Sequence, residues 1–130
     1  IKVAAVADYK PVDPGAIKIK KNPNSKGLTI SMTENMDILK QIGNLKTKDQ
    51  FLVGFAAETN DLEHHALLKM EKKNLDMIAA NLVGTDDSGF KTDTNKVKLF
   101  LKDGSSKDIP LMDKEKVAHI LLDTIIEQTG

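Results

Sequence analysis

Short apolar runs alternate with amphipathic segments in this chain of 130 residues, and that alternation restricts its fold more than any other feature. Residues 51–53 ("FLV") and 75–83 ("LDMIAANLV") have the continuous apolar character of strands that are covered on both faces. Between them, residues 61–73 follow a helical pattern. Strands that alternate with helices indicate an α/β domain with a largely parallel sheet, and the length fits one domain with one core.

The beginning of the chain predicts three short strands. Residues 1–8 form an apolar run without clean alternation, residues 16–21 ("AIKIKK") alternate isoleucine and lysine, and residues 28–32 ("LTISM") are again apolar. Two prolines and a glycine predict a loop over residues 9–15. Because Ile1 already lies inside an apolar run, we expect the chain to be part of a longer protein.

Two helices are predicted to begin at capping residues. Asn60 with Glu63 has the pattern of a capping box and predicts the start of the helix over residues 61–73. Asn35 is the expected N-cap of an earlier helix. Apolar residues recur in that earlier helix at helical spacing: Ile38, Leu39, Ile42 and Leu45.

The C-terminal part predicts a hairpin followed by a helix. Two strand patterns within residues 96–112 flank the dipeptide Asp103-Gly104, which favours tight hairpin turns. Residues 113–130 form an amphipathic helical pattern that ends at Gly130. Its apolar side contains Val117, Ile120, Leu121 and Ile125.

The composition excludes several classes of protein. Nineteen basic and nineteen acidic residues give a net charge of zero, so no overall field attracts nucleic acid or a membrane surface. The absence of cysteine excludes disulfides and thiolate metal sites, and no apolar run approaches the roughly 20 residues that span a bilayer. All nineteen basic residues are lysines, so a bound phosphate must be held by ammonium and backbone N–H groups.

Common catalytic and nucleotide-binding signatures are missing. The chain has no phosphate-binding loop of the G-x-x-x-x-G-K type, no G-x-G-x-x-G and no G-x-S-x-G. The adjacent His64 and His65 point about 100° apart on a helix and therefore do not share a metal ion. We assign no metal ligand.

Small residues followed by a polar group stand where three strands are expected to end, at 4–8, 54–60 and 79–81. Ligands of open α/β sheets bind outside the carboxyl ends of the strands. We therefore predict a flat ligand at this edge of the sheet. Close packing of strand against helix is the alternative explanation for each stretch taken alone.

Lys69 and Lys73 stand one turn apart on the predicted helix, at the edge of its apolar face and within it. Like charges at this spacing repel, so an anion such as a triphosphate would stabilise them. Alternatively, both side chains extend to water and interact favourably with the C-terminal end of the helix dipole.

Lys18, Lys20 and Lys21 precede a stretch rich in turn-forming residues. This arrangement suits either a lid that closes over a phosphate or an edge strand protected by lysines.

Several stretches together resemble the phosphopantothenate–cysteine ligase family, also called phosphopantothenoylcysteine synthetase. They are "AAVADYKP", "KIKK", "LVGFAAETND", "KKNLDMIAAN", "GFKTDTN" and "PLMDKEKVAHILLDTI", in the order of the family and over nearly the whole chain. The resemblance implies a Rossmann-like, three-layer α/β fold with a mostly parallel sheet and a C-terminal β-hairpin plus helix. Residues 1–130 would be a single ligase domain that lacks its N-terminal segment.

The resemblance also implies a cytoplasmic, homodimeric enzyme of coenzyme A biosynthesis. CTP with Mg²⁺ would activate the carboxylate of 4′-phosphopantothenate as an acyl-cytidylate and release pyrophosphate, and the amine of cysteine would then displace CMP. Many bacterial members are fused to an FMN-dependent decarboxylase, which is absent from these residues. Neither nucleic acid nor membrane is an expected partner.

Site residues follow from the matching positions. Lys18 would be the catalytic lid lysine, Asp8 would line the nucleotide site, and Phe55 would contact the base or ribose. The complete set implied for the nucleotide is Val3, Ala4, Asp8, Lys18, Met36, Asp37, Ile38, Leu39, Phe55, Lys69 and Lys73.

The chain departs from the family at three positions. Met36 stands where proline is common, Leu82 where an aspartate is usual, and Lys10 where an arginine is usual.

Two other functions stay open on the residues alone. One is a nucleotide-binding module without catalysis; the other is a nicotinamide- or flavin-binding domain, against which the missing glycine fingerprint argues.

Overall fold

The computed structural model describes residues 6–15, 17–20, 26–82 and 93–130. The chain forms two compact units, Ile1–Ile38 and Leu39–Gly130. The predictions for residues 1–5, 16, 21–25 and 83–92 lie outside the described residues.

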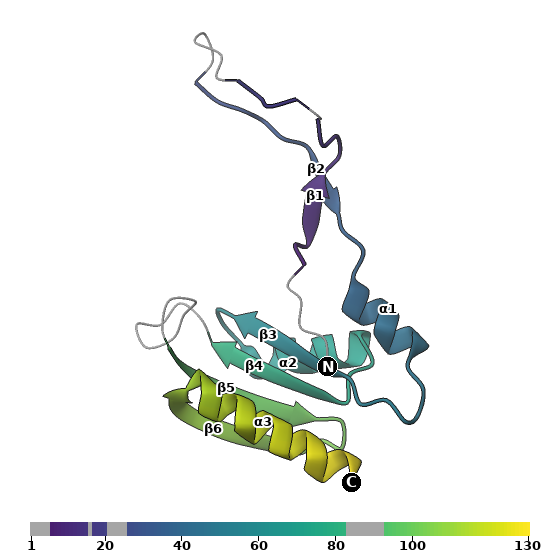
Figure 1. The fold of residues 1–130 in the computed structure, drawn as a ribbon, viewed down its shortest axis with the longest axis vertical. Coiled ribbons are helices and arrows are strands. Elements are labelled where there is room, and N and C mark those ends of the chain that lie inside the picture. Colours follow the sequence, from purple (N-terminus) through teal and green to yellow (C-terminus); the bar gives the residue numbers. More distant parts are fainter. Residues whose placement is uncertain (1–5, 16, 21–25, 83–92) are drawn as a thin grey trace. The chain divides into compact units, whose positions relative to one another are not determined.

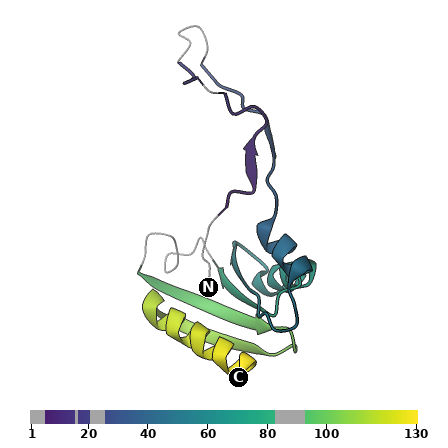
Figure 2. The same cartoon turned by 45° about the vertical axis from the view of Figure 1, so that its right-hand side comes forward.

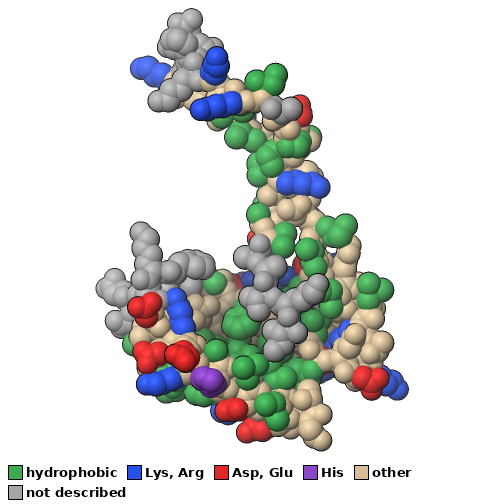
Figure 3. All heavy atoms as spheres, in the orientation of Figure 1, with side chains coloured by type: hydrophobic (Ala, Val, Ile, Leu, Met, Phe, Trp, Pro, Cys, Tyr) green, Lys and Arg blue, Asp and Glu red, His purple; other side chains and the backbone are tan. Residues whose placement is uncertain are grey.

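The first unit contains a two-stranded antiparallel sheet of β1 (Tyr9–Pro11) and β2 (Met32–Glu34), in which Tyr9 pairs with Glu34. Pro11 has no N–H group to donate and stands at the end of its strand, where this loss is tolerated. The backbone N–H of Val12 continues the ladder by donating to the carbonyl of Ser31 at 3.0 Å. Figure 3 shows apolar side chains along this unit, and its described large apolar residues are about half exposed or more.

The predicted strands of this unit are wrong in position. Residues 17–20 and 28–31 are not strands, residues 6–8 are not part of one, and the predicted loop at 9–15 contains β1. Alternation of apolar and polar residues predicts a strand because one face is buried. Here Ile17 is 84% exposed and Ile19 66%, so neither face of this stretch is covered.

The second unit has a four-stranded sheet in the order β3-β4-β5-β6. β3 (Val53–Glu58) and β4 (Met77–Leu82) are parallel, whereas β5 (Thr94–Leu101) is antiparallel to both β4 and β6 (Ser106–Asp113). The predicted α/β class and the C-terminal hairpin with its helix are confirmed (Figure 1). The sheet is mixed, because the strand after β4 runs antiparallel to it.

Helices cover both faces of this sheet and make three layers (Figures 1 and 2). α2 (Leu62–Lys72) packs on β3 and β4, and α3 (Lys114–Thr129) packs on β5 and β6. Side chains of β4 alternate between the two layers. Met77 and Ala79 join the cluster under α3, with Val117 and Leu121, while Ile78 and Ala80 join the cluster under α2, with Ala66.

The helices begin later than the capping patterns predicted. α1 (Ile38–Leu45) starts three residues after Asn35, whose side chain instead donates to the carbonyl of Ala7 at 2.9 Å. Asp61, rather than Asn60, precedes α2, and its backbone is left-handed (φ 41°) without a side-chain capping bond. Both capping predictions are therefore wrong, although both helices exist.

The hairpin turn uses the predicted residues. Gly104 has φ +87°, a conformation that costs glycine little. The carboxylate of Asp103 accepts hydrogen bonds from the hydroxyl of Ser105 at 2.6 Å and from its backbone N–H at 2.8 Å. These bonds to Ser105 lower the pKa of Asp103.

α1 approaches the end of α2 so closely that only glycine fits at Gly43. A Cβ atom built there would overlap the carbonyl oxygen of Lys73. This oxygen is a backbone atom, so it cannot move aside as the end of a flexible side chain can. We expect Gly43→Ala to lower the free energy of unfolding by about 1–3 kcal/mol, because α1 must shift away from α2. Urea denaturation would measure the loss. Gly27→Ala is the control, since nothing lies within 4 Å of its added Cβ, and an equal loss in both variants would contradict this account.

Candidate functional site

One predicted site residue, Lys69, forms a close ion pair at the carboxyl end of β3. Lys69 of α2 reaches Glu58, the last residue of β3, with 2.6 Å between its Nζ and Oε1. Glu58 is 13% exposed and Lys69 44%, so the carboxylate is largely covered while the ammonium group still faces solvent. One of the three N–H donors of Lys69 is used on Glu58, which holds the group in place and leaves donors for a ligand.

Phe55 lies on the other face of β3. Residues of a strand alternate between the two faces of the sheet. Positions 54 and 56 face α2, so the side chain of Phe55 extends from the opposite face. Phe55 pairs in register with Ala79 and is 71% exposed. The structure therefore does not bring Phe55 and Lys69 onto one face of the sheet.

The small residues of β3 and β4 have a packing role, which corrects part of the ligand prediction. A Cβ at Gly54 would come within 2.5 Å of the side chain of Leu75. Ala56 is 4% exposed, and Ala79 and Ala80 are 1% and 0% exposed within the two core clusters. For these four residues the alternative explanation, close packing against neighbouring elements, is the correct one. Ala57 is exposed, and Ala4 lies outside the described residues.

The neighbouring strand ends bring two amides together. Asn81 of β4 donates from its Nδ2 to Oδ1 of Asn95 on β5 at 3.4 Å, a long hydrogen bond. Both side chains are partly buried. They add neutral polar groups to the edge at which β3 ends, since Asn81 pairs in register with Ala57.

The first unit holds the other predicted residues. Asp8 accepts a hydrogen bond at its backbone carbonyl from the N–H of Asn35 at 2.7 Å, so the stretch before β1 is tied to the stretch after β2. Lys18 is exposed and lies outside any strand. Met36 and Ile38 are 63% and 48% exposed, and Asp37 is also exposed. Val3 and Ala4 lie outside the described residues.

Leu39 and Lys73, the remaining predicted residues, have structural surroundings in the second unit. Leu39 packs against the core cluster under α2. Lys73 is the C-cap of α2, and its backbone faces Gly43 of α1. Lys69 and Lys73 thus have different structural roles: the side chain of Lys69 pairs with Glu58, whereas Lys73 is the residue at which α2 ends.

The described part of the chain offers neither a cluster of metal ligands nor a membrane-spanning helix. It contains no group of three or more histidine, aspartate or glutamate side chains that could hold a metal ion. None of its helices combines the length and the apolar character that crossing a membrane requires.

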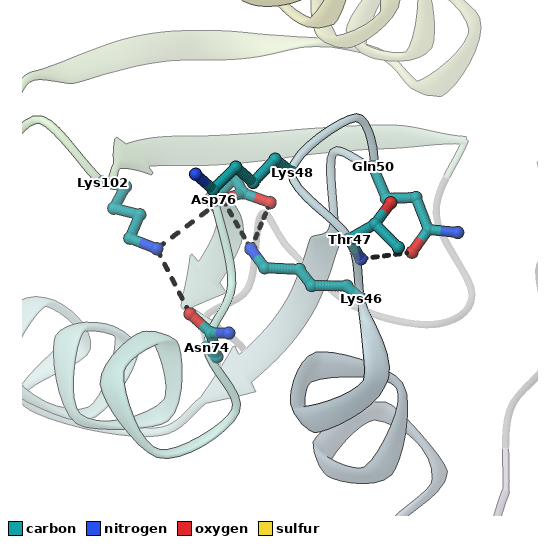
Figure 4. Close-up of a pocket in the computed structure, with 7 residues that line it drawn as sticks. All are labelled: Lys46, Thr47, Lys48, Gln50, Asn74, Asp76 and Lys102. Atoms are coloured by element: carbon teal, nitrogen blue, oxygen red, sulfur yellow. Dashed lines mark hydrogen bonds and ion pairs between the residues drawn. The ribbon is translucent and has the colours of Figure 1, made fainter.

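A second polar cluster, which the sequence did not predict, surrounds Asp76 just before β4. Lys46 donates to both carboxylate oxygens of Asp76 at 2.6 Å, and the backbone N–H of Leu52 donates to Oδ2 at 2.8 Å (Figure 4). The side chains of Lys46 and Asp76 are 9% and 17% exposed. The only sequence signal is an acidic residue at the start of an apolar strand, two residues after Asn74, whose left-handed backbone (φ 50°) ends the turn after α2.

Comparison with protein families identifies one match. The family model described as the DNA/pantothenate metabolism flavoprotein C-terminal domain matches residues 1–129. The Coenzyme A biosynthesis bifunctional protein CoaBC of Bacillus subtilis is 46% identical over 100% of this chain, and that of Escherichia coli K12 is 44% identical over 97%. The chain spans only 32% and 31% of these two proteins, about a third of their length.

Solved structures agree with this match. The crystal structure of the C-terminal domain of Coenzyme A biosynthesis bifunctional protein CoaBC is similar with a TM-score of 0.66 and 36% identity, over 94% of this chain and 50% of that chain. The DNA/pantothenate metabolism flavoprotein from Streptococcus pneumoniae gives a TM-score of 0.70 at 18% identity, over 95% of this chain and 60% of that chain, and supports the fold alone.

Proposed function

Since the chain belongs to the family of DNA/pantothenate metabolism flavoprotein C-terminal domains, we propose that it is the CTP-binding part of a phosphopantothenate–cysteine ligase. The observation that carries this proposal is the similarity over the whole chain to bifunctional proteins of coenzyme A biosynthesis. The substrates would be CTP, 4′-phosphopantothenate and cysteine. The enzyme would act as a cytoplasmic homodimer.

The proposed reaction has two steps. The carboxylate of 4′-phosphopantothenate attacks the α-phosphorus of CTP, which forms an acyl-cytidylate and releases pyrophosphate. The amine of cysteine then attacks the acyl carbon, and the bond to CMP breaks while the amine loses a proton. Negative charge develops on the phosphates in both steps, so fixed cations around them stabilise the transition states.

Lys69 is suited to one of these cationic roles. Its ammonium group is held by Glu58 and still exposed, so a phosphate oxygen can bind it without ordering a free side chain. Asn81 and Asn95 offer neutral amide groups at the same end of the sheet. We assign the base or ribose to Phe55, whose ring is 71% exposed on the opposite face of β3. A nucleotide that reaches both Lys69 and Phe55 would therefore cross β3, the outermost strand of the described four-stranded sheet.

Mg²⁺, when bound with the triphosphate, would offset part of its charge. The described residues offer no cluster of ligands for it. The triphosphate oxygens are therefore its expected ligands, and no residue of this chain is assigned to the ion.

Removal of the Lys69 charge should weaken nucleotide binding. We expect Lys69→Met to raise the dissociation constant of CTP about 10- to 100-fold, because a charge-assisted bond to phosphate is lost. Lys72→Met is the matched control, since Lys72 is exposed on the same helix. Calorimetric titration of the natural protein would measure both, and equal affinities in the two variants would remove Lys69 from the site.

The isolated chain has a second candidate function, nucleotide binding without catalysis, because it spans about a third of its curated relatives. Thermal unfolding with CTP, ATP or NAD, each with and without Mg²⁺, tests binding by the chain itself. A ligand at about 100 times its dissociation constant adds roughly 2.7 kcal/mol of stability. A shift specific to CTP supports the proposed site, whereas a shift with NAD alone would support a nicotinamide-binding domain instead.

A further inference from the structure

The pocket around Asp76 lies at the amino end of β4, whereas Lys69 and Glu58 of the proposed nucleotide site meet at the carboxyl end of the parallel strand β3. It has a volume of about 330 Å³ and is lined by residues of the loop after α1, the turn after α2 and the end of β5. The lining residues are Lys46, Thr47, Lys48, Gln50, Asn74, Asp76 and Lys102 (Figure 4). The residues proposed for CTP do not line it.

The pocket has an excess of positive charge. Its lining contains three lysines and one carboxylate, so two positive charges are left over. Asp76 forms a close ion pair with Lys46 at 2.6 Å. Lys102 stands farther from the same carboxylate, at 3.9 Å, donates one hydrogen bond to Oδ1 of Asn74 at 3.2 Å and is 61% exposed, so it keeps donors for a ligand. Lys48, which also lines the pocket, forms no hydrogen bond or ion pair with the described residues.

An apolar pocket continues from the charged one. It has a volume of about 290 Å³, shares Asn74 and Lys102 with its neighbour, and is otherwise lined by Leu67, Met70, Glu71 and Leu75. Leu67 is 39% exposed, so the apolar wall faces solvent in part. Glu71 would repel an anionic group from this side, which leaves the end with Lys48 and Lys102 for the charge.

We propose that the two pockets form one site for a small phosphate monoester with an apolar substituent. The phosphate dianion would lie between Lys48 and Lys102, whose two charges match its own, and the substituent would lie on Leu67, Met70 and Leu75. Lysine ammonium groups bind phosphate as point charges and need no fixed fork geometry. The site is independent of the proposed ligase activity.

Phenyl phosphate and inorganic phosphate are the probes, and their dissociation constants for the natural protein can be measured by ligand-observed NMR. We expect phenyl phosphate to bind about tenfold more tightly, because its ring is removed from water. In Lys48→Met/Lys102→Met the affinity for phenyl phosphate should fall at least about tenfold. Both side chains are exposed, so the variant should fold, which a thermal unfolding curve checks.

Two controls separate this site from others. Lys96→Met/Lys116→Met removes the same charge from exposed positions outside the pocket and should leave binding unchanged. Lys69→Met, in the proposed nucleotide site, should also leave it unchanged. The proposal is overturned if binding is not saturable, if either control loses as much affinity as the pocket variant, or if the two probes bind equally.

Discussion

Replacement of Lys18 by glutamine in the natural protein is expected to lower the rate of ligation at least about a hundredfold, with little change in CTP affinity. Lys18 is exposed and lies outside any strand of the first unit. The resemblance to the ligase family predicts that it is the lid lysine. A lid residue of this kind acts on charge that develops during the reaction, so its loss affects kcat more than ground-state binding. Glutamine keeps much of the length and the hydrogen-bonding capacity but removes the charge.

Steady-state kinetics and a CTP titration together test this role. Lys20→Gln is the matched control, because it removes the same charge from a side chain that is also exposed and lies two residues away. Its rate should stay within about threefold of the unmodified protein. An unchanged rate in Lys18→Gln, or an equal loss in Lys20→Gln, would remove Lys18 from the catalytic machinery.

Replacement of Asp76 by alanine is expected to lower the free energy of unfolding by about 3–5 kcal/mol. The substitution leaves the ammonium group of Lys46, which is only 9% exposed, without its carboxylate. It also removes the acceptor for the backbone N–H of Leu52, which enters β3. Asp76 therefore joins the loop after α1 to the start of β4, and its loss disturbs both.

Urea denaturation would measure the change in stability. Asp108→Ala is the control, since Asp108 is exposed on β6, and should change stability by less than about 0.5 kcal/mol. In Lys46→Met/Asp76→Ala the buried charge is removed as well, so this variant should be more stable than Asp76→Ala. A double variant as unstable as the sum of its single variants would contradict this explanation.

The second unit could be predicted largely from its sequence because its elements bury apolar surface at regular spacing. β4 reads as a continuous apolar run since α2 and α3 cover its two faces, and Gly104 marks the turn of the hairpin. The predicted packing residues of α3 were also correct, with Val117 and Leu121 in the core. The antiparallel direction of β5 relative to β4 has no comparable local signal.

The first unit could not be predicted in the same way. Its isoleucines alternate with lysines as in a half-buried strand, but Ile17 and Ile19 are exposed, so the pattern has no packing partner within the unit. β1 and β2 are only three residues long, and β1 contains Pro11, which sequence rules place in a loop. Strand formation there depends on pairing between distant residues rather than on local preference.

The candidate site was predictable in its residue types but not in its contacts. Helical spacing places Lys69 at the edge of the packing face, yet only the structure shows that Glu58 is its partner. The small size of Gly54 and Ala56 suggested a ligand, although their close neighbours are protein side chains. A sequence pattern cannot separate these explanations because both require a residue without bulk.

The most direct test of the central claim is the release of pyrophosphate by the natural protein, measured with CTP and 4′-phosphopantothenate and then with cysteine added. We expect one equivalent of pyrophosphate per active site without cysteine, and multiple turnovers with formation of CMP once cysteine is present. Failure of CTP to give pyrophosphate in the presence of both substrates would contradict the assignment of this chain to a CTP-dependent ligase.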